Sequence, residues 1–135
     1  MNKIPSKIRN IATSGGVVLV DLESGNSKMS ALLIDADDLP PWLVPNAEVI
    51  AVFKESELSI AVELAGKISL RNRFFCIVKS ISRGELLSLV DLNFGEQTLY
   101  SAITTRSVNA LELTPGTPVT ALIKANEISL IQPKL

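Results

Sequence analysis

Short apolar runs alternate with turn residues along the second half of the chain. Five runs rich in β-branched and apolar residues cover 75–82, 86–92, 98–103, 119–123 and 127–131. Runs of this length and composition predict β-strands. Between the third and fourth runs, Val108 and Leu111 share one helical face behind a stretch that opens with hydroxyl residues, which predicts a short capped helix.

A tight turn follows the predicted helix. Pro115 and Gly116 occupy the two central positions of a type II turn, and Pro45 and Asn46 do so in the first half. Glycine and asparagine are the residues that tolerate the positive φ of this turn. Five short strands interrupted by one small helix predict an OB-like barrel.

The two halves of the chain repeat one pattern. A shift of 70 positions places Leu19-Val20-Asp21-Leu22 on Leu89-Val90-Asp91-Leu92 without a gap. The same shift pairs Gly25 with Gly95, Leu43 with Leu113, Pro45 with Pro115, Val49 with Val119, Ala51 with Ala121, Lys54 with Lys124, Glu57 with Glu127 and Ser59 with Ser129. We therefore predict an all-β protein of two tandem five-stranded OB-like barrels, each with a short helix. The expected boundary at Gly66–Lys67 divides the chain into residues 1–66 and 67–135.

Composition removes several classes of function. The net charge is −1 and aromatic residues are 4% of the chain, so an OB-type nucleic-acid platform is disfavoured. Histidine is absent and Cys76 is the single cysteine, which argues against zinc hydrolysis and nucleophilic triads. No apolar run approaches the roughly 18 residues of a membrane span, and residues 1–5 lack a signal-peptide core. We expect a cytoplasmic protein that is not an enzyme.

Two repeated acidic residues invite a catalytic interpretation. Asp21 and Asp91 lie inside apolar strands and recur together with their neighbours. A role in maintaining the fold therefore suits them better than catalysis.

Four motifs in the second half resemble those of the molbindin family, whose units are also called Mop domains. They are Ser69-Leu70-Arg71-Asn72, Thr104-Thr105-Arg106-Ser107, Leu113-Thr114-Pro115-Gly116 and Val119-Thr120-Ala121-Leu122-Ile123-Lys124-Ala125. The tandem arrangement is similar to two-module molybdate-binding proteins and to the effector region of the molybdate-responsive regulator. The resemblance implies a homo-oligomer, a dimer or larger, that binds molybdate or tungstate at subunit interfaces and needs no organic cofactor. The implied ligand-binding residues are Ser69, Arg71, Asn72, Thr104, Ser107, Lys124 and the Ala125 amide.

These residue types suit a tetrahedral dianion, which offers only hydrogen-bond acceptors. Arg71 supplies a planar fork that can meet two oxygens, and Lys124 supplies a compact charge. The hydroxyls of Thr104 and Ser107 add donors at a helix start, although helix capping alone would also explain them.

The first half lacks this donor chemistry at the corresponding helix. Ile34 and Asp37 stand where the second half has Thr104 and Ser107, and a carboxylate there would repel an oxyanion. The first repeat is therefore expected to be degenerate as an anion site, at about one anion per chain.

Three alternatives stay open from sequence. Asp35, Asp37 and Asp38 could bind a cation, although they lack calcium-loop spacing. The chain could be the regulatory barrel region of a molybdate-import ABC ATPase, although no Walker A pattern occurs. An OB-type nucleic-acid module is the third. Sequence does not separate a carrier from a sensor, or molybdate from tungstate.

Overall fold

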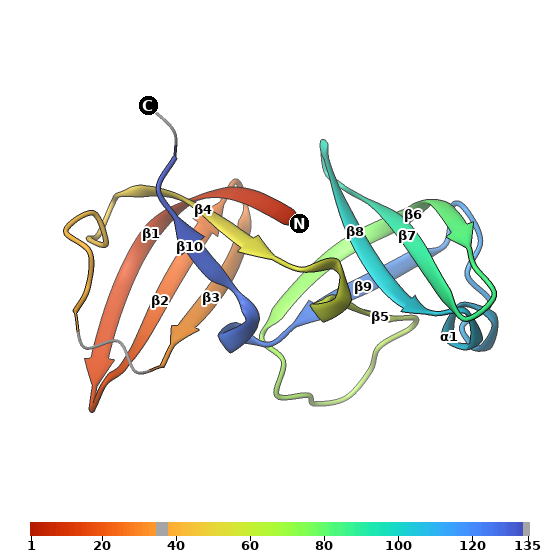
Figure 1. The fold of residues 1–135 in the computed structure, drawn as a ribbon, viewed down its shortest axis with the longest axis horizontal. Helices are drawn as coiled ribbons and strands as arrows, with labels where there is room; N and C mark the ends of the chain where they lie inside the picture. The colour runs from red at the N-terminus through yellow and green to blue at the C-terminus, as the bar shows by residue number, and fades with distance from the viewer. Residues whose placement is uncertain (35–37, 134–135) are drawn as a thin grey trace. The chain divides into compact units, whose positions relative to one another are not determined.

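The computed structural model describes residues 1–34 and 38–133 and is built almost entirely of β-strands (Figure 1). The strands in the first half are β1 (Asn2–Ser14), β2 (Val17–Ser24), β3 (Ser27–Leu33), β4 (Glu48–Phe53) and β5 (Ser59–Ala61). Those in the second half are β6 (Asn72–Arg83), β7 (Leu87–Phe94), β8 (Gln97–Thr104), β9 (Pro118–Ile123) and β10 (Ser129–Ile131). The helix α1 (Thr105–Ala110) follows β8, and the 3₁₀ turns η1 (Glu55–Glu57) and η2 (Ala125–Glu127) precede β5 and β10. The all-β class and the five strands expected in the second half are confirmed.

Strand β1 and its repeat β6 bury alternate side chains, as strands with one face on a core must. Each carries a register shift at the same place, between Ile8 and Asn10 in β1 and between Val78 and Ser80 in β6. A bulge of this kind sharpens the local twist and helps a five-stranded sheet to curl.

The repeated aspartates lie opposite these bulges. Asp21 faces Asn10 across the ladder and accepts a hydrogen bond from Ser30 Oγ at 2.8 Å. Asp91 faces Ser80 and accepts a hydrogen bond from its Oγ at 3.2 Å. Both carboxylates occupy equivalent positions of the two sheets and accept a structural hydrogen bond, from a serine of β3 in the first sheet and from a serine of β6 in the second.

The chain forms two compact units that do not coincide with the two repeats. We call them the N-terminal unit, which holds Asn2–Phe53 and the chain from Lys124 onward, and the central unit, which holds Met1 and Lys54–Ile123. Strand β10 of the second repeat pairs with β4, and β5 of the first repeat pairs with β9. The expected boundary at Gly66–Lys67 therefore separates the repeats in sequence only. Strands β4 and β9 are equivalent in the two repeats, and so are β5 and β10. The exchange therefore keeps the same kind of strand pair in each sheet.

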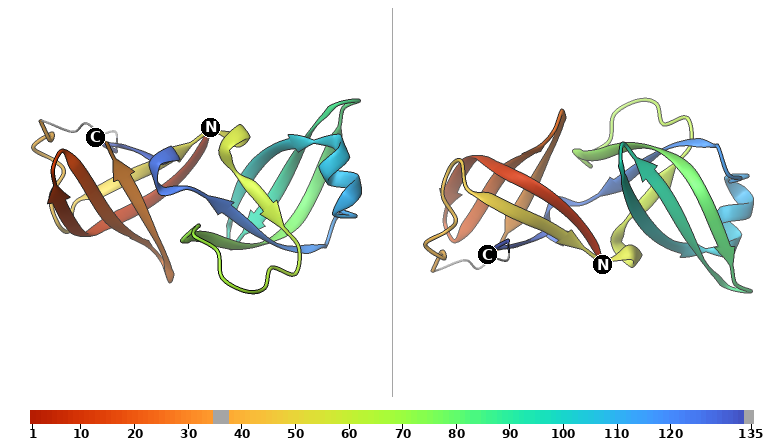
Figure 2. Two further views of the ribbon diagram at one scale, coloured as in Figure 1. Left: turned by 90° about the horizontal axis from the view of Figure 1, so that it is seen from below. Right: turned by 90° about the horizontal axis from the view of Figure 1, so that it is seen from above.

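The N-terminal unit is a sheet of order β10-β4-β1-β2-β3. Its last strand lies near its first, so the sheet is a partly closed barrel (Figure 2). Its core includes Ile4, Ile8, Val20, Leu22 and Ile128, each at most 2% exposed. Ile128 comes from the second repeat, so the exchanged segment contributes to the core as well as to the ladder.

The central unit is a sheet of order β5-β9-β6-β7-β8, and helix α1 packs near β7 and β8. Leu58 from the first repeat is 1% exposed here, and its carbonyl accepts a hydrogen bond from Ser101 Oγ at 2.5 Å. Phe74 is fully buried and makes an edge-to-face contact with Phe94, with ring centroids 5.2 Å apart. This aromatic pair is specific to the second repeat.

The predicted type II turns form in both repeats. Gly116 has a φ of 95° and Asn46 a φ of 71°, in the left-handed region that these two residue types tolerate. The amide of each residue also donates to a strand carbonyl at 2.8 Å, Gly116 to Val78 and Asn46 to Ile8. The matching bonds tie each turn to the bulged strand of its own sheet.

The helix expected in the first barrel does not form over residues 38–47, which carry only turns and bends. Pro40 and Pro41 fall where the last turn of α1 ends in the second repeat. Proline has no amide hydrogen to donate and disfavours helical geometry in the residue before it, so Leu39 and Pro40 cannot continue a helix. Residues 35–37 lie outside the described part of the chain.

Candidate functional site

The hydroxyl residues predicted to bind an anion lie at the start of α1. Thr104 is the N-cap residue, and its Oγ1 accepts a hydrogen bond from the Ser107 amide at 3.0 Å. The two hydroxyl oxygens are 2.8 Å apart, and either can donate to the other. One shared bond uses one of the two hydroxyl hydrogens, so the other can donate to a ligand. Thr104 therefore caps the helix, and one hydroxyl hydrogen of the Thr104–Ser107 pair is still available to a ligand.

Neighbouring bonds fix the start of α1 against the β6–β7 turn. Thr105 Oγ1 donates to the Gly84 carbonyl at 2.8 Å and lies 2.7 Å from Ser88 Oγ. The Thr105 amide donates to the Leu86 carbonyl at 2.9 Å, and Arg83 Nη1 donates to Asn109 Oδ1 at 2.7 Å. These contacts hold the hydroxyl pair rigidly at one end of the central unit.

Two open hollows flank the hydroxyl pair within the central unit. One, of about 520 Å³, is lined by Glu85, Leu86, Thr104, Thr105, Arg106 and Asn109. The other, of about 370 Å³, is lined by Ser59, Ile60, Ile103, Ser107, Ala110 and Leu111. Each of the two hydroxyl residues therefore faces a hollow that is open to solvent.

The Ser-Leu-Arg-Asn motif lies at the start of β6. Ser69 and Arg71 are exposed, whereas Asn72 is buried at 1% exposure and pairs with Ile123 of β9. Arg73 Nε donates to the Leu70 carbonyl at 3.1 Å and so ties the strand to the motif before it. The sequence interpretation missed Arg73, because a hydrogen bond to a main-chain oxygen leaves no sequence signature.

The second basic position directly follows the same strand pair. Lys124 comes after Ile123, is exposed, and begins the turn η2 with an extended backbone. Ala125 is half-buried. Within the described residues no carboxylate pairs with Lys124 or Arg71, since the ion pairs there join Met1 to Glu55 and Arg9 to Glu23. Both cations are therefore available to an external anion.

Within one chain, the Ser-Leu-Arg-Asn motif lies far from the hydroxyl pair of Thr104 and Ser107. Asn72 begins β6 and Arg83 ends it next to α1, so the strand separates the motif from the hydroxyl pair. At about 3.3 Å per residue a strand of this length spans roughly 30 Å or more. A tetrahedral anion needs its donors within about 3 Å of its oxygens. Ser69, Arg71 and Asn72 therefore cannot share one ion with Thr104 and Ser107 of the same chain.

The first repeat has a counterpart of the motif that sequence interpretation missed. Asn2 lies 70 positions before Asn72, is also 1% exposed, begins β1 and pairs with Phe53. The shift that reveals the repeat also reveals this pair and assigns Met1 to the position of Arg71.

The described residues do not support a cation site at Asp35, Asp37 and Asp38. Asp35 and Asp37 lie outside them, and Asp38 is exposed. Over residues 1–34 and 38–133 no cluster of three or more His, Cys, Asp or Glu side chains could hold a metal ion. In the same ranges no helix has the length and apolar character to cross a membrane.

Comparison with known proteins defines the class. A model of the TOBE domain matches residues 68–130. The molybdenum-pterin-binding protein MopA of Rhodobacter capsulatus is 33% identical over 114 residues, 83% of this chain and 43% of that protein. MopB of the same organism is 35% identical over 89 residues, 62% of this chain and 33% of that protein. The chain thus spans less than half the length of these two relatives.

A solved structure matches the whole tandem arrangement. It is a molybdate-bound form of the cytoplasmic molybdate-binding protein ModG, similar with a TM-score of 0.92 at 25% identity over 98% of this chain and 96% of that chain. This chain belongs to the molbindin family of Mop and TOBE domains, in its tandem form. The family inferred from the four sequence motifs is confirmed.

Proposed function

We propose that this chain binds molybdate, or the similarly sized tungstate, as a cytoplasmic carrier, buffer or sensing region, and catalyses no reaction. The observation that carries the proposal is a pair of exposed cations at one end of the β6–β9 ladder. Arg71 directly precedes Asn72, Lys124 directly follows Ile123, and Asn72 pairs with Ile123. Neither cation has a carboxylate partner among the described residues. A molybdate-bound ModG structure with the same fold supports the choice of ligand.

Each proposed donor has a distinct role towards the anion. The Arg71 guanidinium can meet two oxygens in its plane, and the Lys124 ammonium adds a point charge that offsets the loss of hydration. Ser69 and the Ala125 amide add neutral donors, and buried Asn72 fixes the strand end from which Arg71 projects.

The second half of the shell comes from another copy of the chain. Thr104 and Ser107 are roughly a full strand length from Asn72 within one chain, so they complete the site of a neighbouring chain. We therefore propose a homo-oligomer, a dimer or larger, with anion sites at its interfaces. Light scattering at micromolar concentration checks the assembly, and a monomeric mass contradicts it.

Titration calorimetry tests the ligand. Molybdate and tungstate are expected to bind with about one anion per chain, because only the second repeat carries the full donor set. Sulfate and phosphate at equal ionic strength serve as controls, and both are expected to bind at least tenfold more weakly. Equal affinity for all four anions would contradict a built oxyanion site, and no binding of molybdate would overturn the proposed function.

A further inference from the structure

Two apolar patches lie on the outer surface of the central unit, one near the start of β6 and one at the β6–β7 turn. The first, the strand patch, is formed by Phe75 and Ile77 of β6, which are 78% and 50% exposed. The second, the hairpin patch, is formed by Leu86 and Leu87, which are 83% and 62% exposed. Large apolar side chains that are exposed together mark a surface that another molecule covers.

The strand patch lies beside a cation of the proposed molybdate site. Arg71 directly precedes β6, and Phe75 follows four residues later, roughly 13 Å away at the rise of a strand. An open hollow of about 680 Å³ adjoins the patch, and its lining includes Val62 and Leu64 together with Phe75 and Ile77. The hollow can therefore receive an apolar side chain of another molecule.

The hairpin patch lies beside the hydroxyl pair. Leu87 is the cross-strand partner of Thr104, and directly opposed residues of a ladder lie about 5 Å apart. The Leu86 carbonyl accepts a hydrogen bond from the Thr105 amide at 2.9 Å, and Leu86 lines the same hollow as Thr104. Each patch thus accompanies one of the two donor groups that a single chain keeps apart.

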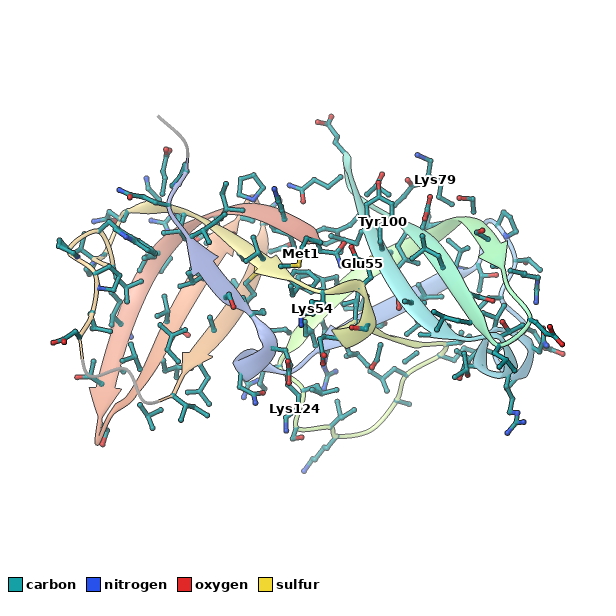
Figure 3. The ribbon with its side chains drawn as sticks, in the orientation of Figure 1. Met1, Lys54, Glu55, Lys79, Tyr100 and Lys124 are labelled. Atoms are coloured by element: carbon teal, nitrogen blue, oxygen red, sulfur yellow. The ribbon has the colours of Figure 1, made fainter. Side chains whose placement is uncertain are left out.

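Polar side chains lie between the two patches. Asp91 of β7 pairs with Tyr100 of β8 in this part of the ladder. Figure 3 shows Tyr100 there, together with Lys79 from the bulge of β6. The patches are therefore two separate surfaces, and each can contact a different neighbour.

The first repeat lacks the strand patch and has a reduced hairpin patch. The shift of 70 positions places Pro5 and Lys7 on Phe75 and Ile77, and Lys7 pairs with Glu48 across the ladder. The same shift places a glycine on Leu86 and a valine on Leu87. Both patches therefore belong to the repeat that carries the hydroxyl pair.

We propose that the strand patch of one chain packs against the hairpin patch of a second copy, with the anion between Arg71 of the first chain and Thr104 and Ser107 of the second. The inference rests on the proposed function, because it takes these donors to be the molybdate site. A copy that brings its hydroxyl pair to an anion bound by Arg71 also brings its hairpin leucines towards Phe75, because each patch adjoins its donor group. The contact joins two unlike surfaces, so it is head-to-tail and closes as a ring when each chain uses both patches.

Phe75→Asp and Leu86→Asp, each made in the full chain, test the contact by light scattering at micromolar concentration. Both side chains are exposed in one chain, so the added charge is expected to break the contact without unfolding the protein, and circular dichroism checks the fold. Each variant is expected to have a smaller mass than the unmodified oligomer and to bind sodium molybdate at least tenfold more weakly. An unchanged mass in either variant would overturn the inference.

An equimolar mixture of the two variants tests the head-to-tail arrangement. Each mixed pair retains one intact strand patch and one intact hairpin patch, so a 1:1 complex that neither variant forms alone is expected. The mixture should also recover one strong molybdate site per pair. If mixing changes neither the mass nor the molybdate affinity, the proposed contact is wrong.

Val44→Asp is the matched control, because it adds the same charge at an apolar residue of the N-terminal unit that is 48% exposed. It should keep the mass and the molybdate affinity of the unmodified chain, and an equal loss would show a general effect of charge and overturn the inference. If the unmodified oligomer binds molybdate and Phe75→Asp retains both properties, the inference fails while the proposed function stands. If the unmodified oligomer binds no molybdate and both variants still lose mass, the proposed function fails while the contact between the patches stands.

Discussion

The first and second repeats share a backbone more closely than they share chemistry. Their bulges, positive-φ turns, buried asparagines and 3₁₀ turns recur at the same positions. They differ at the helix start, at residue 55 against residue 125, and in the aromatic contact that only the second repeat makes. Fold is thus specified by positions that repeat, whereas the proposed binding depends on the few that do not.

The largest expected effect is on the stability of the central unit. Phe74→Ala removes a fully buried ring and its contact with Phe94, and it should lower the free energy of unfolding by about 3–5 kcal/mol. The matching change in the first repeat is Ile4→Ala, which removes a smaller buried side chain with no aromatic partner. Urea unfolding followed by circular dichroism compares the two. A larger loss in Ile4→Ala would contradict the greater packing role assigned to the second repeat.

The next effect concerns the equivalent lysines. Lys124→Ala should weaken molybdate binding by about 1.5–3 kcal/mol, the usual value of a charge-assisted hydrogen bond. Arg71→Ala should do the same, while both variants keep their unfolding temperature because neither cation pairs with a carboxylate in the described chain.

Lys54→Ala is the control for Lys124→Ala. It removes the same charge at the same backbone position of the first repeat, which has Ile34 and Asp37 where the second has Thr104 and Ser107. Its affinity measured by calorimetry should match that of the unmodified chain. An equal loss of molybdate affinity in Lys54→Ala and Lys124→Ala would contradict the proposed functional difference between the repeats.

A somewhat smaller effect is expected from Ser107→Asp, which gives α1 the residue found at position 37. The carboxylate removes a hydroxyl donor and repels the anion, so molybdate affinity should fall about tenfold, or ~1.4 kcal/mol. Stability should stay the same or rise slightly, because a negative charge in the first turn suits the helix dipole. Ser107→Ala separates the lost hydroxyl from the added charge. Unchanged binding in Ser107→Asp would place the site away from this helix.

Sequence predicted local structure well because the signals are local. Alternating burial in β6, the turn at Pro115–Gly116 and the cap at Thr104 follow from residues next to one another. The exchange of β5 and β10 was not predictable in this way, because either sheet offers the same edge to either strand. The proposed ligands were named from motifs, but only the structure shows that β6 separates them into two groups.

The smallest effect is expected at Cys76, whose counterpart in the first repeat is Ser6. Both are buried, and both donate to the carbonyl two residues earlier, Cys76 Sγ to Phe74 at 3.4 Å and Ser6 Oγ to Ile4 at 2.9 Å. Cys76→Ser therefore places a residue that the fold already accepts in this setting. The free energy of unfolding at pH 7 should change by less than about 1 kcal/mol.

Alkaline pH distinguishes the thiol from the hydroxyl in the same pair of proteins. Burial raises the pKa of Cys76 from 9.0 to about 12, so the folded chain keeps the thiol neutral while the unfolded chain ionises it first. The contribution of this group to stability is complete below pH 9 and is lost as pH rises towards 12. Cys76→Ser has no such group. Its free energy of unfolding, measured with urea, should therefore rise relative to that of the unmodified chain between pH 9 and 10.5. Parallel pH profiles would mean that the Cys76 thiol ionises equally in the folded and unfolded chains.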